Sequence, residues 1–165
     1  MDRLQHLLLK PGNDERNALR NARSHYDTSN TLFSSFLSPD MSYSCAIWKT
    51  TTEGEKEEEE EEESLGDAQR RKVHNVIDKA RIRKEHHVLD IGGGWAFLAI
   101  EAVKKTGCKV TVTTLSVEQK ALGEKRVKEE GLEGSIDVCL TFPTTLSGLV
   151  VELRIRLIAS SNLLA

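Results

Sequence analysis

The spacing of apolar residues changes along the chain. Apolar groups at helical spacing predict helices over residues 1–10 and 14–23 and a short helix around Phe33 that stops at Pro39, with polar loops between them. A longer amphipathic helix is predicted after Ser64, with a buried face of Ala68, Val73, Val76, Ile77 and Ala80. From Val88 onward, short β-branched runs alternate with helical patterns. This alternation predicts an α/β fold in which helical crossovers connect parallel strands.

The alternating region predicts three strands and two helices. The strands cover residues 88–91, 109–115 and 135–140. The helices cover residues 95–105 and 117–130, and Ser116 is placed to cap the second helix.

A fourth strand is predicted near the end of the chain. Residues 150–157 alternate between apolar and charged side chains, as in a half-buried strand. Only residues 141–148 separate this segment from the third strand, which is too short for a parallel crossover. We therefore expect an antiparallel hairpin on the third strand, which leaves one edge of the first strand unpaired.

Length and charge limit the organisation of the chain. At 165 residues it has the size of one domain. Residues 53–63 carry nine acidic side chains and one lysine, and such a run is typical of a solvated insertion. The rest of the chain has 22 basic and 17 acidic residues, an excess too small and too dispersed for a dedicated nucleic-acid binder. We therefore predict four parts: a helical cap that covers the cofactor (residues 1–52), an acidic disordered insertion (53–63), a partial α/β domain (64–140) and a divergent tail (141–165).

The cysteine and histidine patterns exclude several classes of site. The three cysteines lie far apart without a CxxC pair, which argues against a disulfide framework and a zinc site. No two histidines have the spacing of an HExxH motif. No apolar stretch approaches the length of a spanning helix and no secretory signal is recognisable, so we expect a cytoplasmic protein without a bound metal.

A glycine-rich turn is the strongest candidate for a ligand site. It follows the first predicted strand as Asp90-Ile91-Gly92-Gly93-Gly94-Trp95-Ala96 and opens a helix. Glycines let the backbone approach a ligand closely, and the first N–H groups of the helix favour electron-rich atoms. A tight turn without any nucleotide remains the alternative interpretation.

Two absences narrow the choice of nucleotide. The third glycine of a dinucleotide motif is replaced by Phe97, and the second strand ends without an acidic residue, which disfavours NAD. The GK[ST] triplet of phosphate-loop NTPases is also missing. Asp90 just before the glycines is placed to meet a cationic group or the amides of the loop, and a cofactor with an amino group and a sulfonium, S-adenosylmethionine, fits such a site.

Several blocks, in the same order, resemble the cyclopropane-fatty-acyl-phospholipid synthases and the related mycolic acid cyclopropane synthases. They are residues 25–30, 36–41 and 43–45, Trp48, the LxxAQxxK pattern of Leu65, Ala68, Gln69 and Lys72, residues 88–95, residues 110–119 and Gly131-Leu132. The resemblance covers roughly residues 21–140. It implies a partial Rossmann-like class I methyltransferase fold, a three-layer αβα sandwich with an N-terminal helical cap and without its later strands.

The resemblance also implies an activity and a set of site residues. The family transfers a methyl group from S-adenosylmethionine to a double bond in an acyl chain of a membrane phospholipid, and bound bicarbonate accepts the proton lost on ring closure. Cys45 would contact bicarbonate as the catalytic residue. The implied cofactor-binding residues are Tyr43, Ser44, Asp90, Gly92, Gly94, Trp95, Thr114, Leu115, Ser116 and Gln119. Equally, Tyr43 could be an ordinary half-buried aromatic residue and Cys45 a small buried apolar one.

The chain departs from the family at two places. Ala96 stands where members usually carry glycine, and we expect it in the first turn of a helix with little effect on the cofactor. After Leu140 the later strands of the family are not recognisable. The open alternatives are a lipid-modifying methyltransferase completed by a partner, a truncated and inactive cofactor-binding fragment, a methyltransferase for another small molecule, and a scaffold protein.

Overall fold

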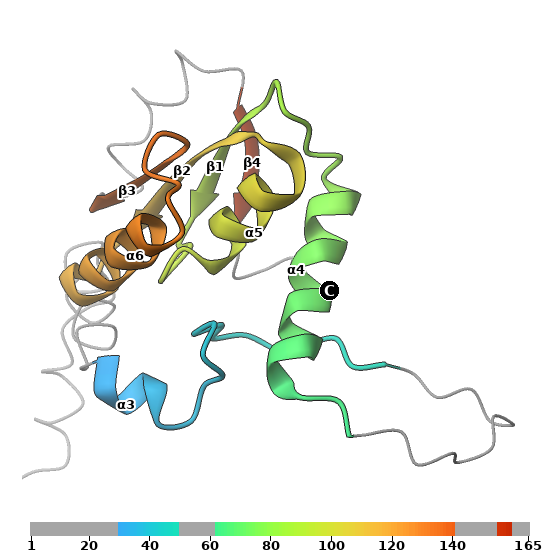
Figure 1. Cartoon of the computed structure of the whole chain (residues 1–165), viewed down its shortest axis with the longest axis vertical. Helices are drawn as coiled ribbons and strands as arrows, with labels where there is room; N and C mark the ends of the chain where they lie inside the picture. The colour runs from blue at the N-terminus through green and yellow to red at the C-terminus, as the bar shows by residue number, and fades with distance from the viewer. Residues whose placement is uncertain (1–29, 50–61, 141–154, 160–165) are drawn as a thin grey trace, which may run out of the picture.

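A parallel sheet forms the centre of the structure. The computed structural model describes residues 30–49, 62–140 and 155–159. Its four strands run in the spatial order β3-β2-β1-β4, and all neighbours are parallel (Figure 1). The bounds are β1 (His87–Ile91), β2 (Lys109–Thr114), β3 (Ile136–Leu140) and β4 (Ile155–Ala159). The three strands predicted in the alternating region are therefore confirmed, with ends that shift by one residue.

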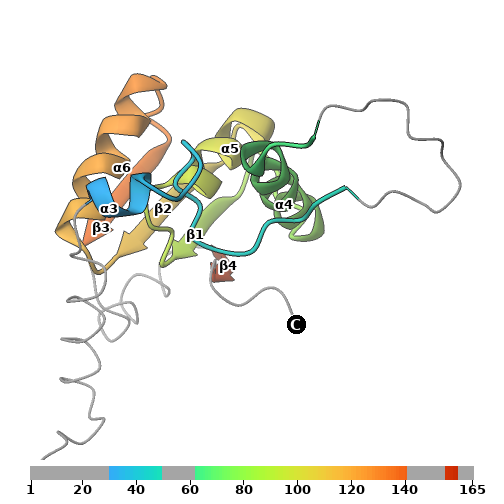
Figure 2. The same cartoon turned by 90° about the horizontal axis from the view of Figure 1, so that it is seen from below.

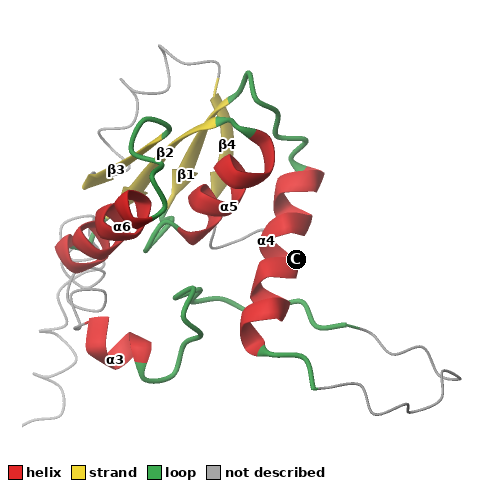
Figure 3. Ribbon diagram, viewed as in Figure 1, coloured by secondary structure: helices red, strands yellow, loops and turns green. Residues whose placement is uncertain are grey.

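Three helices cover one face of the sheet. They are α4 (Leu65–Lys79), α5 (Phe97–Thr106) and α6 (Val117–Glu129), and Figure 2 shows them on the same side of the strands. Successive right-handed crossovers that move in one direction across a sheet place their helices on one face, which accounts for α5 and α6. In the described residues the fold thus has one sheet layer and one helix layer (Figure 3).

The core lies between these two layers. It combines Val73 and Ile77 of α4 with apolar residues of α5, and it includes Val127 of α6. The sheet contributes Val88, Val110, Val112, Ile136 and Val138. The predicted buried face of α4 is confirmed, since Ala68 is also buried and Val76 and Ala80 are partly buried against the core.

Serine caps begin two of the helices, as predicted. The Ser64 hydroxyl accepts a hydrogen bond from the Asp67 N–H at 3.1 Å, and the Ser116 hydroxyl accepts one from the Gln119 N–H at 3.3 Å. Each bond satisfies one of the N–H groups that a helix start leaves without an intrahelical partner.

The helix predicted around Phe33 is short. It forms α3 (Asn30–Ser34), and a loop continues from it to residue 49. Phe33 is buried with Met41 and Trp95 in a small apolar cluster separate from the main core. Residues 30–49, which we call the cap segment, therefore pack on the glycine turn through Phe33.

The prediction of a hairpin for the tail is wrong. β4 pairs in parallel with β1, not antiparallel with β3, and His87 is aligned with Ile155 in the register. The strand begins at Ile155, later than predicted, so residues 141–154 connect β3 to β4. A connection of this length meets the requirement of a parallel crossover for about a dozen residues. Pairing with β4 also gives β1 a hydrogen-bonding neighbour on both sides, as a buried central strand requires.

Ala96 also differs from its prediction. It is the residue before α5, not part of the first helical turn, and its backbone is left-handed with a φ of 66°. This conformation costs an L-residue roughly 1–2 kcal/mol and favours glycine. Its side chain is completely buried, so packing of the methyl group offsets part of that cost.

Several predictions concern residues outside the described part of the chain. They are the helices before residue 24, most of the acidic insertion, the second helical layer and the greater part of the tail. Of the acidic run, only Glu62 and Glu63 are described, and the Glu63 carboxylate accepts hydrogen bonds from Arg71 and from the Lys49 N–H.

The packing of α6 on the sheet predicts a stabilising substitution. A Cβ at Gly123 would lie 3.6 Å from Val138 Cγ1 and 3.7 Å from Ala96 Cβ, which are ordinary contacts. Gly123→Ala should therefore raise the free energy of unfolding by about 0.5–1 kcal/mol, because glycine loses more backbone entropy in a helix than alanine does. Urea unfolding followed by circular dichroism measures this change, and a lower stability would contradict the packing of α6.

Candidate functional site

The glycine turn joins β1 to α5 through two left-handed backbone positions. Gly92 and Gly94 have φ angles of 72° and 58°, in the left-handed region where glycine is tolerated without a Cβ penalty. The N–H groups of Gly92 and Gly93 donate to the Thr113 carbonyl at 2.9 and 3.1 Å. These bonds fix the turn against the end of β2.

The Asp90 carboxyl lies beneath this turn. It is completely buried, and neither of its oxygens has a hydrogen-bond partner within the described residues. A Cβ at Gly93 would overlap the carboxyl group and lie 2.7 Å from Val112 Cγ1, so only glycine fits above it. Burial raises the pKa of Asp90 to about 7. Such a group is expected at a functional site, because an isolated buried carboxyl is costly in a purely structural role.

The end of β2 forms the second part of the site. The Thr114 hydroxyl donates to Gln119 Oε1 at 2.6 Å and accepts from the Ser116 N–H at 3.3 Å. All three of these side chains are buried, whereas Leu115 between them is half-buried. The structure therefore brings these predicted cofactor residues together at the start of α6, where they also serve as a helix cap.

The third part of the site is the segment from Ser42 to Ser44, which Gln69 and Lys72 of α4 hold by hydrogen bonds. Gln69 Nε2 donates to the Ser44 carbonyl at 2.7 Å, and Lys72 Nζ donates to the hydroxyls of Ser42 and Ser44 at 2.9 and 2.6 Å. The site prediction omitted Gln69 and Lys72. Their spacing in the LxxAQxxK pattern, one turn apart on α4, was the available signal.

Aromatic contacts join the cap segment to the glycine turn. The Phe33 ring lies 5.3 Å from Tyr43 and 5.1 Å from Trp95, measured between ring centroids. Trp95 is buried, and its indole N–H donates to Asn30 Oδ1 at 2.7 Å. Tyr43 and Trp95 thus belong to one cluster, in which Tyr43 is half exposed while Trp95 anchors α3.

Cys45 follows this cluster as an exposed free thiol. The alternative of a small buried apolar residue is thereby excluded for this position. Its place next to Ser44 puts it in the electrostatic range of the Lys72 ammonium.

The first two parts lie at the edge of the sheet where open α/β folds bind ligands. The glycine turn and Leu115 follow the carboxyl ends of β1 and β2, which are parallel neighbours. The strand order places β2 and β4 on opposite sides of β1, so the direction of the crossovers reverses there. Open α/β sheets bind ligands outside the carboxyl ends of their strands at such a switch point.

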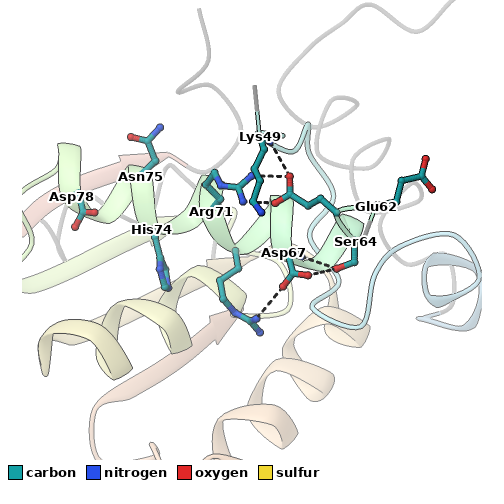
Figure 4. A pocket seen from close by; sticks show the side chains of 10 residues that line it. Lys49, Glu62, Ser64, Asp67, Arg71, His74, Asn75 and Asp78 are labelled. Atoms are coloured by element: carbon teal, nitrogen blue, oxygen red, sulfur yellow. Dashed lines mark hydrogen bonds and ion pairs between the residues drawn. The ribbon is translucent and has the colours of Figure 1, made fainter. Parts of the chain in front are cut away.

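A separate polar groove runs along α4 and contains none of the predicted site residues. Figure 4 shows Arg71 directed at Glu63 and Asp67 directed at Ser64. The groove is lined by Lys49, Glu62, Glu63, Ser64, Asp67, Arg70, Arg71, His74, Asn75 and Asp78. Several of its charges pair with each other, Arg71 with Glu63 and Arg70 with Asp67.

Two searches of the described residues gave no further sites. No group of three or more histidine, cysteine, aspartate or glutamate side chains in that part of the chain could hold a metal ion. None of the described helices is both long and apolar enough to cross a bilayer.

Comparison with known proteins gave consistent matches. The family model for mycolic acid cyclopropane synthetase matches residues 13–147. Tuberculostearic acid methyltransferase UfaA1 from Mycobacterium tuberculosis is 38% identical over 130 residues, which is 79% of this chain and 30% of that protein. The cyclopropane-fatty-acyl-phospholipid synthase of Escherichia coli K12 is 35% identical over 114 residues, or 69% of this chain and 26% of the enzyme.

Solved structures agree with the sequence matches. Mycolic acid cyclopropane synthase CmaA1, complexed with SAH and CTAB, superposes with a TM-score of 0.64 and 29% identity over 81% of this chain and 41% of that one. The chain spans only 26–30% of the length of the two curated relatives described above. The match over residues 13–147 and the identities of 38% and 35% to these relatives show that this chain belongs to the mycolic acid cyclopropane synthetase family, which includes the cyclopropane-fatty-acyl-phospholipid synthases.

Proposed function

We propose that this chain binds S-adenosylmethionine and provides the cofactor site for methyl transfer to the double bond of unsaturated phospholipid acyl chains. The observation that carries the proposal is the glycine turn above the buried Asp90 carboxyl, at the switch point of the sheet. Thr114 to Gln119 follow the end of β2, the strand next to β1. The cap segment packs on the turn through Phe33.

The residues of the turn fit a cationic nucleoside ligand. A Cβ at Gly94 would meet nothing within 4 Å, so the turn is open above this residue. Asp90 supplies a carboxyl group without a protein partner in the described residues. S-adenosylmethionine carries an ammonium and a sulfonium group, and a positive charge near a buried carboxyl stabilises its ionised form.

When bound, the cofactor supplies an already activated methyl group, so the protein has mainly to position the reactants and exclude water. In this proposal Tyr43 and Ser44 contact its methionyl part, while Gly92, Gly94 and Trp95 shape the cradle. Thr114, Leu115, Ser116 and Gln119 line the adenosine side. Cys45, which is exposed beside Ser44, contributes one contact to bicarbonate.

The acyl substrate is supported by the relatives and by the surface of the cap segment. The relatives include a tuberculostearic acid methyltransferase and cyclopropane-fatty-acyl-phospholipid synthases. Large apolar side chains are exposed on the cap segment at Leu32, Phe36, Tyr43 and Trp48. These residues offer apolar contacts for a lipid chain at a membrane surface.

Gly94→Ala tests the cofactor site directly. The new methyl group points into the open face of the turn, so it should lower the affinity for S-adenosylhomocysteine about 10-fold or more, as measured by calorimetric titration. Gly131→Ala is the matched control, because Gly131 also has a positive φ, of 67°, and open space around its Cβ but follows α6. Both substitutions should cost roughly 1 kcal/mol of stability, and only the first should reduce binding.

Equal affinities for the two variants would place the ligand elsewhere. Absence of saturable binding by a wild-type chain that melts cooperatively would overturn the cofactor proposal.

Stability should depend on pH through Asp90. The pKa of this carboxyl rises from 3.8 to about 7 on folding, so between these values the folded protein binds more protons than the unfolded chain. The stability contributed by the neutral carboxyl is fully present below pH 3.8 and is lost as the pH rises through about 7. Relative to Asp90→Asn, the wild-type free energy of unfolding should fall by about 4 kcal/mol over this range. Urea unfolding at several pH values measures the difference, and parallel pH profiles for the two proteins would contradict a buried carboxyl.

Methyl transfer to lipid is tested with labelled S-adenosylmethionine and phospholipid vesicles. Vesicles with cis-monounsaturated chains should acquire label, whereas vesicles with saturated chains should not, because the reaction requires a double bond. Binding of S-adenosylhomocysteine without any transfer would support the alternative of a cofactor-binding fragment, and transfer only to soluble acceptors would indicate another substrate class.

A further inference from the structure

The Lys72 side chain is a buried cation without an ion-pair partner among the described residues. Only 8% of the residue is exposed, and no described carboxylate lies within 4.0 Å of Nζ. Of the two described acidic groups that act on it, Asp40 has the larger electrostatic effect, but its oxygens accept hydrogen bonds from Ser38 Oγ at 2.5 Å and the Ser42 N–H at 2.8 Å. Burial lowers the pKa of Lys72, and the Asp40 and Cys45 charges partly offset this effect.

All three donors of the ammonium are used by neutral oxygens. They go to Ser42 Oγ, to Ser44 Oγ and, at 2.6 Å, to Gln69 Oε1. An ammonium group can only donate, so both serine oxygens act as acceptors toward Lys72. Each hydroxyl hydrogen then remains available to donate to another group, and no described residue accepts either of them. Ser44 is exposed, so its hydroxyl is accessible to a ligand.

Through this arrangement the buried Lys72 ammonium polarises the exposed Ser44 hydroxyl. A hydroxyl that accepts a hydrogen bond from a cation is polarised and becomes a stronger donor. A charged ligand group compensates a buried ion that lacks a counter-ion in the protein. The ligand group that fits is therefore an anion at Ser44.

We propose that Lys72 is a positioning residue that orients the Ser44 hydroxyl toward the α-carboxylate of the bound cofactor. This inference rests on the proposed function and extends it to a residue of α4 beneath the cap segment. Lys72 does not touch the ligand, because its donors are already occupied, and it acts through the charge and orientation of Ser44.

Two ligands that differ only in the carboxylate test the proposal. S-adenosylhomocysteine and its decarboxylated analogue are titrated into the wild-type chain and into Lys72→Met by calorimetry. The substitution should weaken S-adenosylhomocysteine about 10-fold or more and change the affinity for the analogue less than about 3-fold. Lys79→Met, which changes an exposed lysine on the same helix, should leave both affinities unchanged.

Thermal melts separate this role from a structural one. Methionine removes an unpaired buried charge and fills similar space, so Lys72→Met should retain the melting temperature of the wild type or raise it. Ser44→Ala, an exposed position, should show the same selective loss for S-adenosylhomocysteine even if Lys72→Met fails to fold. The double variant should bind no more weakly than the worse single variant, since the two residues act as one unit.

Three results would overturn the proposal. Equal losses for both ligands would assign Lys72 a general structural role, and unchanged affinity for S-adenosylhomocysteine would separate it from the carboxylate. In both cases the proposed function would survive, because binding itself persists. If the folded wild-type chain binds neither ligand, both the proposed function and this inference fail.

Discussion

The close approach of the Gly93 backbone to the Asp90 carboxyl is the constraint on which the rest of the site depends. No Cβ fits between the two, so the turn can pass over the carboxyl only as glycine. The turn then reaches Thr113, whose carbonyl accepts two of its N–H groups, and it directs the chain into α5. A buried carboxyl, a tight turn and a helix start are thereby fixed together at the carboxyl end of β1.

Contacts distant in sequence attach the cap segment to this turn. Asn30 accepts a hydrogen bond from the Trp95 indole and donates one to the Glu118 carbonyl at 3.1 Å, so a single side chain links α3 to the glycine turn and to α6. Arg126 of α6 donates to the carbonyls of Asp40 and Trp95 at 2.8 and 3.2 Å. Because the Asp40 carbonyl belongs to the backbone of the cap segment, the bond from Arg126 holds this segment independently of its exposed apolar side chains. The result is a rigid base beneath the exposed residues 43–45.

Local chemistry explains which parts of the fold were predictable from sequence. The caps at Ser64 and Ser116 and the three β-branched strands depend on neighbouring residues, so their patterns predicted them correctly. The left-handed backbone at Ala96 was missed because it follows from the course of the turn into a packed helix, not from the preference of alanine. The pairing of β4 was missed because the hydrogen-bonding needs of a central strand outweigh the length of a short apparent connection. The role of Lys72 required the fold, since Ser44 lies 28 positions away in sequence.

The two isolated charges of the site indicate the kind of ligand that the protein is built to hold. Asp90 is a buried carboxyl without a hydrogen-bond partner in the described residues, and Lys72 is a buried ammonium whose hydrogen bonds there go only to neutral oxygens. Each is costly when the site is empty, because neither has a counter-ion of its own. A zwitterionic amino-acid group carries an ammonium and a carboxylate on one carbon, which are the two charges opposite to those of Asp90 and Lys72. Binding of such a group would relieve unfavourable burial in the folded state, so the ligand would stabilise the fold more than its direct contacts alone imply.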